Sequence, residues 1–287
     1  MDRVGRYHPG AADQMGPMEA ETLQALEQLG VGVDWFHHED APGQYKVGLE
    51  YRDALSMGDG LLTYGQVVRQ IGRRHGFAAT FMPKPFTDRE GSGLHFTLSL
   101  MNGDDNVFAD GADTLGLSQV ARGFIAGLLL HGREITLVTN PTVNSYKRLV
   151  PGFAAPTRCT WADSGRGDLV RIPALVASET TPSSRLEYRV ADPSCNPYLA
   201  LASVLEAGLD GVDRELAPPP RRTEDGCQDG TPLPKHLSEA ISAASDSELL
   251  KRVLGEALHA QMLTAATDEW ASYHRQVSQW ELDNYLR

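Results

Sequence analysis

The sequence is poor in cysteine. Only 3 of its 287 residues are cysteines, Cys159, Cys195 and Cys227, and no two of them form a CxxC pair. An odd number of widely spaced cysteines argues against a disulfide framework and against a structural zinc site. We therefore expect the three thiols to be reduced and to serve as structural side chains.

Long apolar runs are also missing. The stretch FIAGLLL at 124–130 is far shorter than the roughly 20 residues that a membrane helix needs. The first residues, MDRVGRYHPGAADQ, lack the apolar core of a secretory signal peptide. These absences lead us to expect a cytoplasmic protein that does not bind membranes.

Clustered positive charge is the third absence. The chain has 26 Lys and Arg residues against 38 Asp and Glu residues, which gives a formal net charge of -12. Such a balance repels phosphate backbones and anionic headgroups unless a local basic patch overcomes it. The pairs Arg73-Arg74 and Arg221-Arg222 are isolated and do not form such a patch. Nucleic acid is therefore not an expected partner.

What the sequence does contain is an alternation of helical and extended patterns. Helical spacing of apolar residues predicts helices at 19–29, 52–75, 118–131 and 197–211 and in most of the C-terminal part. Alternating apolar residues predict extended segments at 33–49, 81–100, 169–173 and 185–190. Turn-forming residues predict loops at 140–156 and 217–233. These patterns favour an α+β fold in which helices cover a sheet.

Two of the predicted strands carry a polar face. These faces hold His95, Thr97 and Ser99 in one strand and Arg185, Glu187 and Arg189 in the other. Carboxylate, imidazole and guanidinium groups together can hold a divalent metal and an anionic substrate. A simpler explanation stays open for each strand, because an Arg-Glu-Arg alternation is more often a charge ladder facing water and a strand histidine is usually structural.

Six motifs resemble, in order, the successive motifs of the glutamine synthetases and their γ-glutamyl-amine ligase relatives. They are HHEDAPGQ, ATFMPKPF, GSGLHFTLSL, NPTVNSYKRLVPGF, RLEYR followed by DPSCNPYLALA, and WELDNYL. The resemblance runs from about Glu19 to the end of the chain. It implies a single glutamine synthetase-type catalytic domain over residues 1–287, with an antiparallel, curved half-barrel sheet covered by helices.

The resemblance also implies an activity, that of an ATP-dependent carboxylate–amine ligase. In this family glutamate is activated as a γ-glutamyl phosphate, which ammonia or an amine then attacks. Divalent ions, Mg2+ or Mn2+, neutralise the phosphoryl group during its transfer. The family's active-site funnel is shared between subunits, so the resemblance implies a homo-oligomer or co-assembly with a related ligase subunit.

Position by position, the resemblance assigns roles to individual residues. It implies that metal ions are bound by Glu39, His95 and Glu187. It implies that glutamate is held by Gly91, Arg148 and Arg189. The positions that would face ATP and its phosphates are Thr97, Ser99, Arg166 and Arg171.

The chain departs from the family pattern at several positions. A second metal-binding glutamate of the family is Lys46 here, and an ammonium group cannot ligate a cation. The second histidine of the family's GSGMHxH motif, which contacts the transferring phosphate, is Thr97. The glutamate that helps to deprotonate the nucleophile is Ala154, and no other general base is evident in that loop. The Asn of the family's NRS motif is lost beside Arg166.

The family's upstream E-x-E strand and its small β-grasp domain would lie before Met1, so we expect both to be absent. Glu19-Ala20-Glu21 has the E-x-E pattern, but it falls in a predicted helix and is not expected to replace that strand. With so few anionic ligands, the metal sites are expected to be weakened. Lys46 is a candidate for a fixed positive charge in place of the first ion.

Three functions stay open. The first, which the resemblance favours, is a γ-glutamyl ligase of impaired or altered activity. The first alternative is a non-catalytic relative that binds glutamate or a nucleotide, or that co-assembles with a full-length ligase. The second alternative is one half of a split ligase, whose missing portion is another polypeptide. Amine-dependent phosphate release from ATP separates the first function from the non-catalytic alternative.

Overall fold

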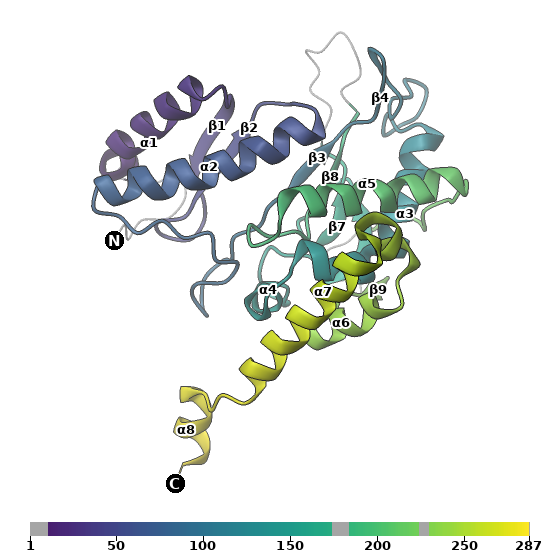
Figure 1. The fold of residues 1–287 in the computed structure, drawn as a ribbon. Helices are drawn as coiled ribbons and strands as arrows, with labels where there is room; N and C mark the ends of the chain where they lie inside the picture. Colours follow the sequence, from purple (N-terminus) through teal and green to yellow (C-terminus); the bar gives the residue numbers. More distant parts are fainter. Residues whose placement is uncertain (1–10, 174–183, 224–229, 287) are drawn as a thin grey trace. The chain divides into compact units, whose positions relative to one another are not determined.

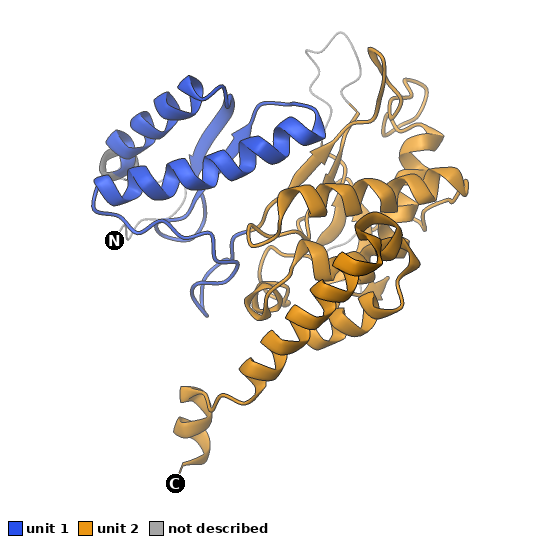
Figure 2. Cartoon of the chain, viewed as in Figure 1, with its two compact units in different colours: residues 1–92 blue, residues 93–287 orange. Residues whose placement is uncertain are grey.

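A computed structural model describes residues 11–173, 184–223 and 230–286 of the chain. The chain divides into two compact units, residues 1–92 and residues 93–287 (Figure 2). Each unit has its own helices and strands (Figure 1). That residues 1–287 form one catalytic domain stays a prediction.

The first unit consists of two helices and a hairpin. Its elements are α1 (Ala11–Gln28), β1 (Val33–His38), β2 (Tyr45–Leu49) and α2 (Ala54–Arg74) (Figure 1). All four lie where the sequence predicts them, although α1 begins before the predicted Glu19. Gly30 follows α1 with a φ of +73°, which explains why a glycine ends the helix at this point.

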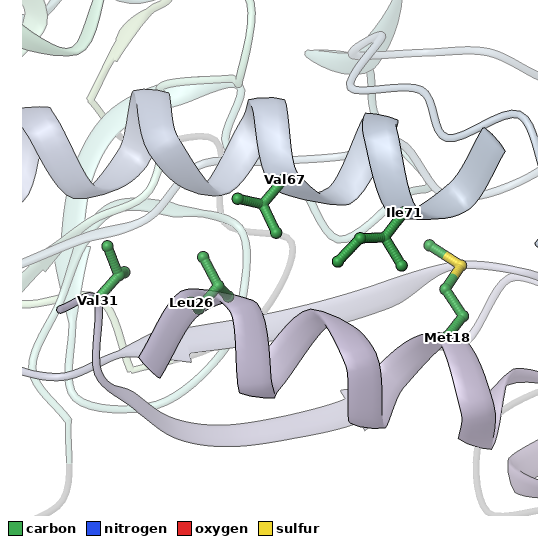
Figure 3. Close-up of a cluster of buried hydrophobic side chains, with 5 residues drawn as sticks. All are labelled: Met18, Leu26, Val31, Val67 and Ile71. Carbon is green, nitrogen blue, oxygen red and sulfur yellow. The ribbon is translucent and has the colours of Figure 1, made fainter. Parts of the chain in front are cut away.

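A small apolar core joins the two helices of the first unit. Met18 and Leu26 of α1 lie toward Val67 and Ile71 of α2, and Val31 belongs to the same cluster (Figure 3). Leu26 and Ile71 are 0% and 1% exposed. The helical spacing of apolar residues in both segments therefore marks the faces that meet.

The Glu19-Ala20-Glu21 segment lies inside α1, as the sequence predicts. Its Glu21 carboxylate contacts Arg74 at 2.7 Å and His75 at 2.6 Å, at the end of α2. The segment is helical, and Glu21 serves to hold the two helices together. It does not provide the metal-binding strand of the family.

The second unit carries a five-stranded sheet, a small hairpin and a set of helices (Figure 1). The strands are β3 (Phe96–Leu98), β4 (Met101–Asn102), β5 (Asp105–Asn106), β6 (Arg158–Ala162), β7 (Asp168–Arg171), β8 (Leu186–Tyr188) and β9 (Thr231–Pro232). The helices are α3 (Gln119–Thr139), α4 (Val143–Arg148), α5 (Pro197–Asp213), α6 (Leu237–Ser245), α7 (Glu248–His274) and α8 (Gln279–Tyr285). None of the helices in the described ranges is long and apolar enough to cross a membrane.

The sheet has the strand order β3-β8-β7-β6-β9. β8 pairs antiparallel with both β3 and β7, and β9 pairs antiparallel with β6, as the resemblance implies. β6 and β7 are parallel, so the sheet is mixed. The α+β class is confirmed, with the correction that one strand pair departs from the expected antiparallel order.

Several segments differ from the sequence-based expectation, among them 81–95, 140–156, the unpredicted strand β6 and the short strand β9 inside the loop predicted at 217–233. Residues 81–95 form no strand. Of the extended segment predicted at 81–100, only Phe96–Leu98 is a strand, β3. The loop predicted at 140–156 contains the helix α4. This helix begins with a capping box, because the Thr142 hydroxyl accepts from the Ser145 N–H and the Ser145 hydroxyl accepts from the Thr142 N–H. The box is hard to recognise because Ser145 takes the place of the usual Glu or Gln.

Helices α3 and α5 cross in close contact because glycines lie where they meet. A Cβ atom on Gly127 would lie 2.1 Å from the carbonyl oxygen of Ala207. A Cβ atom on Gly211 would lie 2.2 Å from the carbonyl oxygen of Gly123. Both neighbours are backbone atoms, so the crossing leaves room only for hydrogen at these positions.

The cysteines that the structure describes are structural, as expected. Cys159 and Cys195 are free and buried, 5% and 8% exposed. Burial raises the pKa of both thiols to about 12, so neither is a reactive thiolate at neutral pH. Cys227 lies outside the described residues.

A cluster of charged groups links α3 to α5. The His131 ring contacts Glu134 through Nδ1, and it contacts Asp210 through Nε2 at 2.9 Å. Arg214 and Arg252 also lie within ion-pair distance of Asp210, at 2.9 and 3.6 Å. Burial acts to lower the pKa of His131, but the hydrogen bonds and charges of Glu134 and Asp210 outweigh it and raise the pKa above its usual value.

We expect the His131→Gln variant to have a flatter dependence of stability on pH than the wild type. Because the folded-state pKa of His131 is raised, its protonated form stabilises the fold below the unfolded pKa of about 6.5. This contribution is lost as the pH rises through the folded-state pKa. Thermal melts between about pH 5.5 and about pH 9 should show a difference between wild type and variant that shrinks toward high pH. Parallel melting curves across the range would contradict this assignment.

Candidate functional site

Three neighbouring strands place polar side chains on one face of the sheet. Thr97 of β3 and Arg171 of β7 are both paired with Glu187 of β8. Directly paired residues project to the same face, so these three side chains share it. Phe96 and Tyr188, which are 4% and 0% exposed, belong to the opposite, apolar face. The separation into a polar and an apolar face is as the sequence predicts.

Glu187 is the centre of a buried ion-pair cluster. Its Oε1 atom lies 2.9 Å from His95 Nδ1 and 2.9 Å from Arg189 Nη1, and its Oε2 atom lies 2.5 Å from Arg171 Nε. Burial acts to raise the pKa of Glu187, but the His95 hydrogen bond and the three cationic partners outweigh it and hold the pKa well below its usual range. Glu187 and Arg189 are each 4% exposed, which excludes a charge ladder facing water.

Arg148 is a second buried arginine, only 3% exposed. Its guanidinium group donates hydrogen bonds to the backbone carbonyls of Arg189, Val190 and Ala191, at 3.0, 2.6 and 3.2 Å. A Cβ atom on Gly93 would lie 2.4 Å from Arg148 Nη2 and 3.1 Å from His95 Nε2. The absence of a side chain at Gly93 therefore makes room for these two groups of the protein.

Arg189 combines burial with an unused donor. Its Nη1 atom bonds Glu187, while its Nε atom is buried and has no hydrogen-bond partner. Burial lowers the pKa of Arg189, and the nearby positive charges of Arg171 and Arg166 lower it further. The Glu187 carboxylate raises it but does not outweigh these effects. A buried donor left without a partner costs about 1–3 kcal/mol. A ligand that accepts from this N–H would recover that cost.

The remaining positions predicted in the second unit are placed as follows. Arg166 is exposed in the turn between β6 and β7. Ser99 is half-buried, and its hydroxyl donates to the Ser184 carbonyl at 3.2 Å, so the fold already uses this group. Ala154 is half-buried in the turn that follows Gly152. The phosphate contact expected for Arg166 and the loss of a base expected at Ala154 therefore stay predictions.

The first unit contains the other expected site residues. The Glu39 carboxylate contacts His37 Nε2 at 3.0 Å. Lys46 is paired with His37 across the hairpin, and its Nζ lies 5.5 Å from the centre of the Trp35 ring. The family's acidic position is thus occupied by a cation on the same hairpin as Glu39.

Gly91 is held by a residue that sequence reasoning did not single out. Its carbonyl oxygen accepts a hydrogen bond from Gln44 Nε2 at 2.9 Å. The same amide nitrogen lies 3.4 Å from the Ser92 hydroxyl. Gln44 ends the APGQ motif, so the motif itself was the available signal. Its side chain connects the hairpin loop to the segment that contains Gly91.

Asn140 and Asp192 hold the backbone that follows β8, next to the Glu187 cluster. The sequence patterns did not indicate either residue. Asn140 is fully buried, and its amide donates to the Val190 carbonyl at 2.8 Å and to Asp192 at 2.9 Å. Asp192 in turn accepts from the Ser194 N–H at 2.9 Å. Asp and Ser two residues apart are typical of an Asx turn, which was the available signal.

The described residues do not offer a ligand set that fits a divalent metal. Within 11–173, 184–223 and 230–286, no three His, Cys, Asp or Glu side chains come together as a metal site. His95 and Glu187 form only a pair, and both Glu187 oxygens already contact nitrogen donors. Mg2+ and Mn2+ need several oxygen ligands. The metal-ligand roles expected for Glu39, His95 and Glu187 therefore stay predictions.

Comparison with known proteins agrees with the motifs. The family model for the glutamine synthetase catalytic domain matches residues 1–285. A glutamine synthetase of Clostridium saccharobutylicum is 40% identical over 99% of this chain and 66% of its own length. A glutamine synthetase of Thermus thermophilus is 42% identical over 99% of this chain and 65% of its own length. The chain thus spans about two thirds of the length of these relatives.

Solved structures show the same fold. The structure "GmaS/ADP complex-Conformation 1" has a TM-score of 0.90 and 36% identity, and the match covers 99% of this chain and 67% of that one. The structure "Apo GmaS without ligand" has a TM-score of 0.89 at 36% identity. Motifs, fold and family model agree over nearly the whole sequence, and the chain belongs to the glutamine synthetase family, whose catalytic domain it matches.

Proposed function

We propose that the chain is a γ-glutamyl ligase domain that binds glutamate and ATP and is impaired or altered in ligation. The observation that carries this proposal is the group of guanidinium side chains at the buried Glu187 carboxylate. Arg171 and Arg189 set two positive charges against one carboxylate, Arg148 bonds the backbone carbonyls that follow it, and the Nε of Arg189 is an unused donor. Planar guanidinium groups suit carboxylate and phosphate recognition.

In this proposal some of the arginines bind glutamate and others bind the phosphate groups of ATP. Arg189 and Arg148, with Gly91, hold glutamate. Arg171 and Arg166 face the phosphates and offset the charge that develops during phosphoryl transfer. The similar protein GmaS was solved in complex with ADP, which supports a nucleotide as the second ligand.

The impaired or altered activity follows from the groups that are missing. Ala154 has no proton acceptor, so the attacking amine loses no proton to that position. Thr97 is neutral where the family has a second imidazole. An amine that is already deprotonated at the working pH needs no base. The favoured acceptor is therefore an amine of low pKa, in place of ammonium.

A second candidate is a non-catalytic subunit that binds the same ligands and co-assembles with a complete ligase. The observation that favours it is the joint replacement at Lys46, Thr97 and Ala154, which affects a metal position, a phosphate contact and the base. The two candidates share the acid-binding cluster. They differ in turnover and in the need for a complete ligase as partner.

The binding part of the proposal predicts that L-glutamate binds the wild type and binds Arg189→Lys at least about tenfold more weakly. Lysine keeps the charge but lacks the planar fork, and about tenfold corresponds to the loss of one good hydrogen bond. Isothermal titration calorimetry measures both affinities. Arg158→Lys is the control for the same chemical change outside the cluster, where Arg158 bonds the Gly230 carbonyl at 2.9 Å. No detectable glutamate binding by the wild type would overturn the proposal.

The turnover part is tested by phosphate release from ATP with glutamate and a panel of amines. The ligase candidate predicts amine-dependent release that is slow in the wild type and faster in Ala154→Glu, since the variant regains a proton acceptor. An increase of roughly tenfold or more is expected if a general base is what limits the rate. No amine-dependent release from either protein would leave the non-catalytic candidate.

A further inference from the structure

We propose that the acid-binding site of the second unit works without a divalent metal, because Glu187 serves there as an anchor for two guanidinium groups. The inference rests on the proposed function, since it concerns how that same site binds an anionic group. The resemblance to the family implies that Glu187 is a metal ligand. In this chain it organises Arg171 and Arg189 instead.

The first support is the use of the Glu187 oxygens. A carboxylate offers about four lone-pair positions, and three are occupied here. His95 Nδ1 and Arg189 Nη1 contact Oε1 at 2.9 Å each, and Arg171 Nε contacts Oε2 at 2.5 Å. The Glu187 side chain is 5% exposed, so these partners cannot be replaced by water without loss of stability. An incoming ion would have to displace at least one of them.

The second support is the local balance of charge. Arg148 and Arg189 are buried at 3% and 4% exposure, and Arg171 bonds the same carboxylate as Arg189. Two guanidinium groups on one carboxylate, with Arg148 on the backbone that follows it, already give an excess of positive charge. A divalent cation at this position would meet like charges at short range, which disfavours its binding. An anion at this position would be attracted by the same positive charges, which favours its binding.

The third support is the direction of the replacements. Thr97 is paired with Glu187 on the same sheet face, at the position where the family has an imidazole. On the hairpin of the first unit, Lys46 stands where the family has a carboxylate. One change removes a neutral donor, and the other replaces an acid with a cation. Neither change adds a ligand for a metal ion to the His95–Glu187 pair.

The ligand class follows from the unused donor. Arg189 Nε is buried and has no partner, although the rest of its guanidinium group is held by Glu187. Its N–H favours an oxyanion that can accept a hydrogen bond in a site with little water, such as a carboxylate or a phosphate group. The chain itself thus supplies the charge that would otherwise come from a metal ion.

Manganese titration followed by electron paramagnetic resonance tests the inference directly. The wild type is compared with His95→Gln, which removes the imidazole beside Glu187. We expect the two proteins to bind the same amount of Mn2+ with the same affinity, because no ion occupies this pair. Saturable binding in the wild type that is weakened tenfold or more in His95→Gln would overturn the inference.

Calorimetry with L-glutamate gives a second readout that separates the two proposals. We expect the same affinity in EDTA and in excess Mg2+, within about twofold. Glutamate binding that requires Mg2+ would overturn the metal inference and leave the proposed function standing. Absence of glutamate binding under both conditions would overturn the proposed function, and the manganese comparison would still decide the metal inference.

A gain-of-binding variant completes the test. Thr97→His with Arg171→Ala frees Glu187 Oε2 and adds an imidazole on the same sheet face. We expect this double variant to acquire Mn2+ binding at least tenfold tighter than that of the wild type. Thermal melting checks that the variant is folded. A wild type that already binds manganese as tightly at this pair would contradict the proposed role of Arg171.

Discussion

Arg148→Met is expected to destabilise the second unit by roughly 1.5–3 kcal/mol and to abolish glutamate binding. The guanidinium group bonds three backbone carbonyls that follow β8, at 2.6–3.2 Å. Methionine fills a similar volume but donates no hydrogen bond. The Val190 carbonyl keeps its bond from Asn140 and the Ala191 carbonyl keeps its bond from the Leu94 N–H, so the buried Arg189 carbonyl is the one most affected. Urea unfolding gives the loss in free energy, and calorimetry gives the loss in binding.

Two controls separate the effect of burial from the effect of charge. Arg148→Lys keeps a positive charge but cannot reach all three carbonyls, so it should recover only part of the stability. Arg158→Met removes an arginine that is less deeply buried and bonds the Gly230 carbonyl at 2.9 Å, and its expected cost is below about 1 kcal/mol. Equal losses for Arg148→Met and Arg158→Met would mean that Arg148 does not organise the site.

Gly127→Ala is expected to have the other large effect, a loss of about 3 kcal/mol or more in the free energy of unfolding. The added Cβ would lie 2.1 Å from the Ala207 carbonyl oxygen and 2.8 Å from the Gly211 nitrogen. Both are backbone atoms of α5, so the clash cannot be relieved by a change of rotamer. The two helices would have to move apart and expose part of their shared core.

Gly111→Ala is the matched control for this prediction, because nothing lies within 4 Å of a Cβ built on Gly111. It should change the stability by less than about 0.5 kcal/mol. Urea unfolding of both variants measures the difference. A Gly127→Ala protein as stable as Gly111→Ala would show that the close crossing of α3 and α5 does not depend on the glycine.

Much of the fold could be predicted from the sequence because local patterns specify it. α1, α2, α3 and α5 follow from apolar residues at helical spacing, and β8 follows from its alternation. The helix α4 and the strand β6 were missed for different reasons. α4 starts with a capping box that uses Ser145 in an unfamiliar position, and β6 depends on pairing with strands that are distant in sequence.

The polar strand faces were predictable from the sequence, whereas the contacts between their side chains were not. Alternation placed Thr97 and Glu187 on polar faces, and the strand register brings Thr97, Glu187 and Arg171 together. The contacts of Glu187 with Arg171 and Arg189 depend on side-chain packing, which no spacing rule reveals. The support given by Asn140 and Asp192 was hidden for the same reason.

The most direct test of this account is a crystal structure of the chain with L-glutamate and Mn2+, using the anomalous signal of manganese. The account predicts density for a carboxylate in hydrogen-bond contact with Arg189 and no anomalous peak at bonding distance from both His95 and Glu187. A manganese peak bonded to both side chains, with Arg171 displaced from the Glu187 carboxylate, would contradict it.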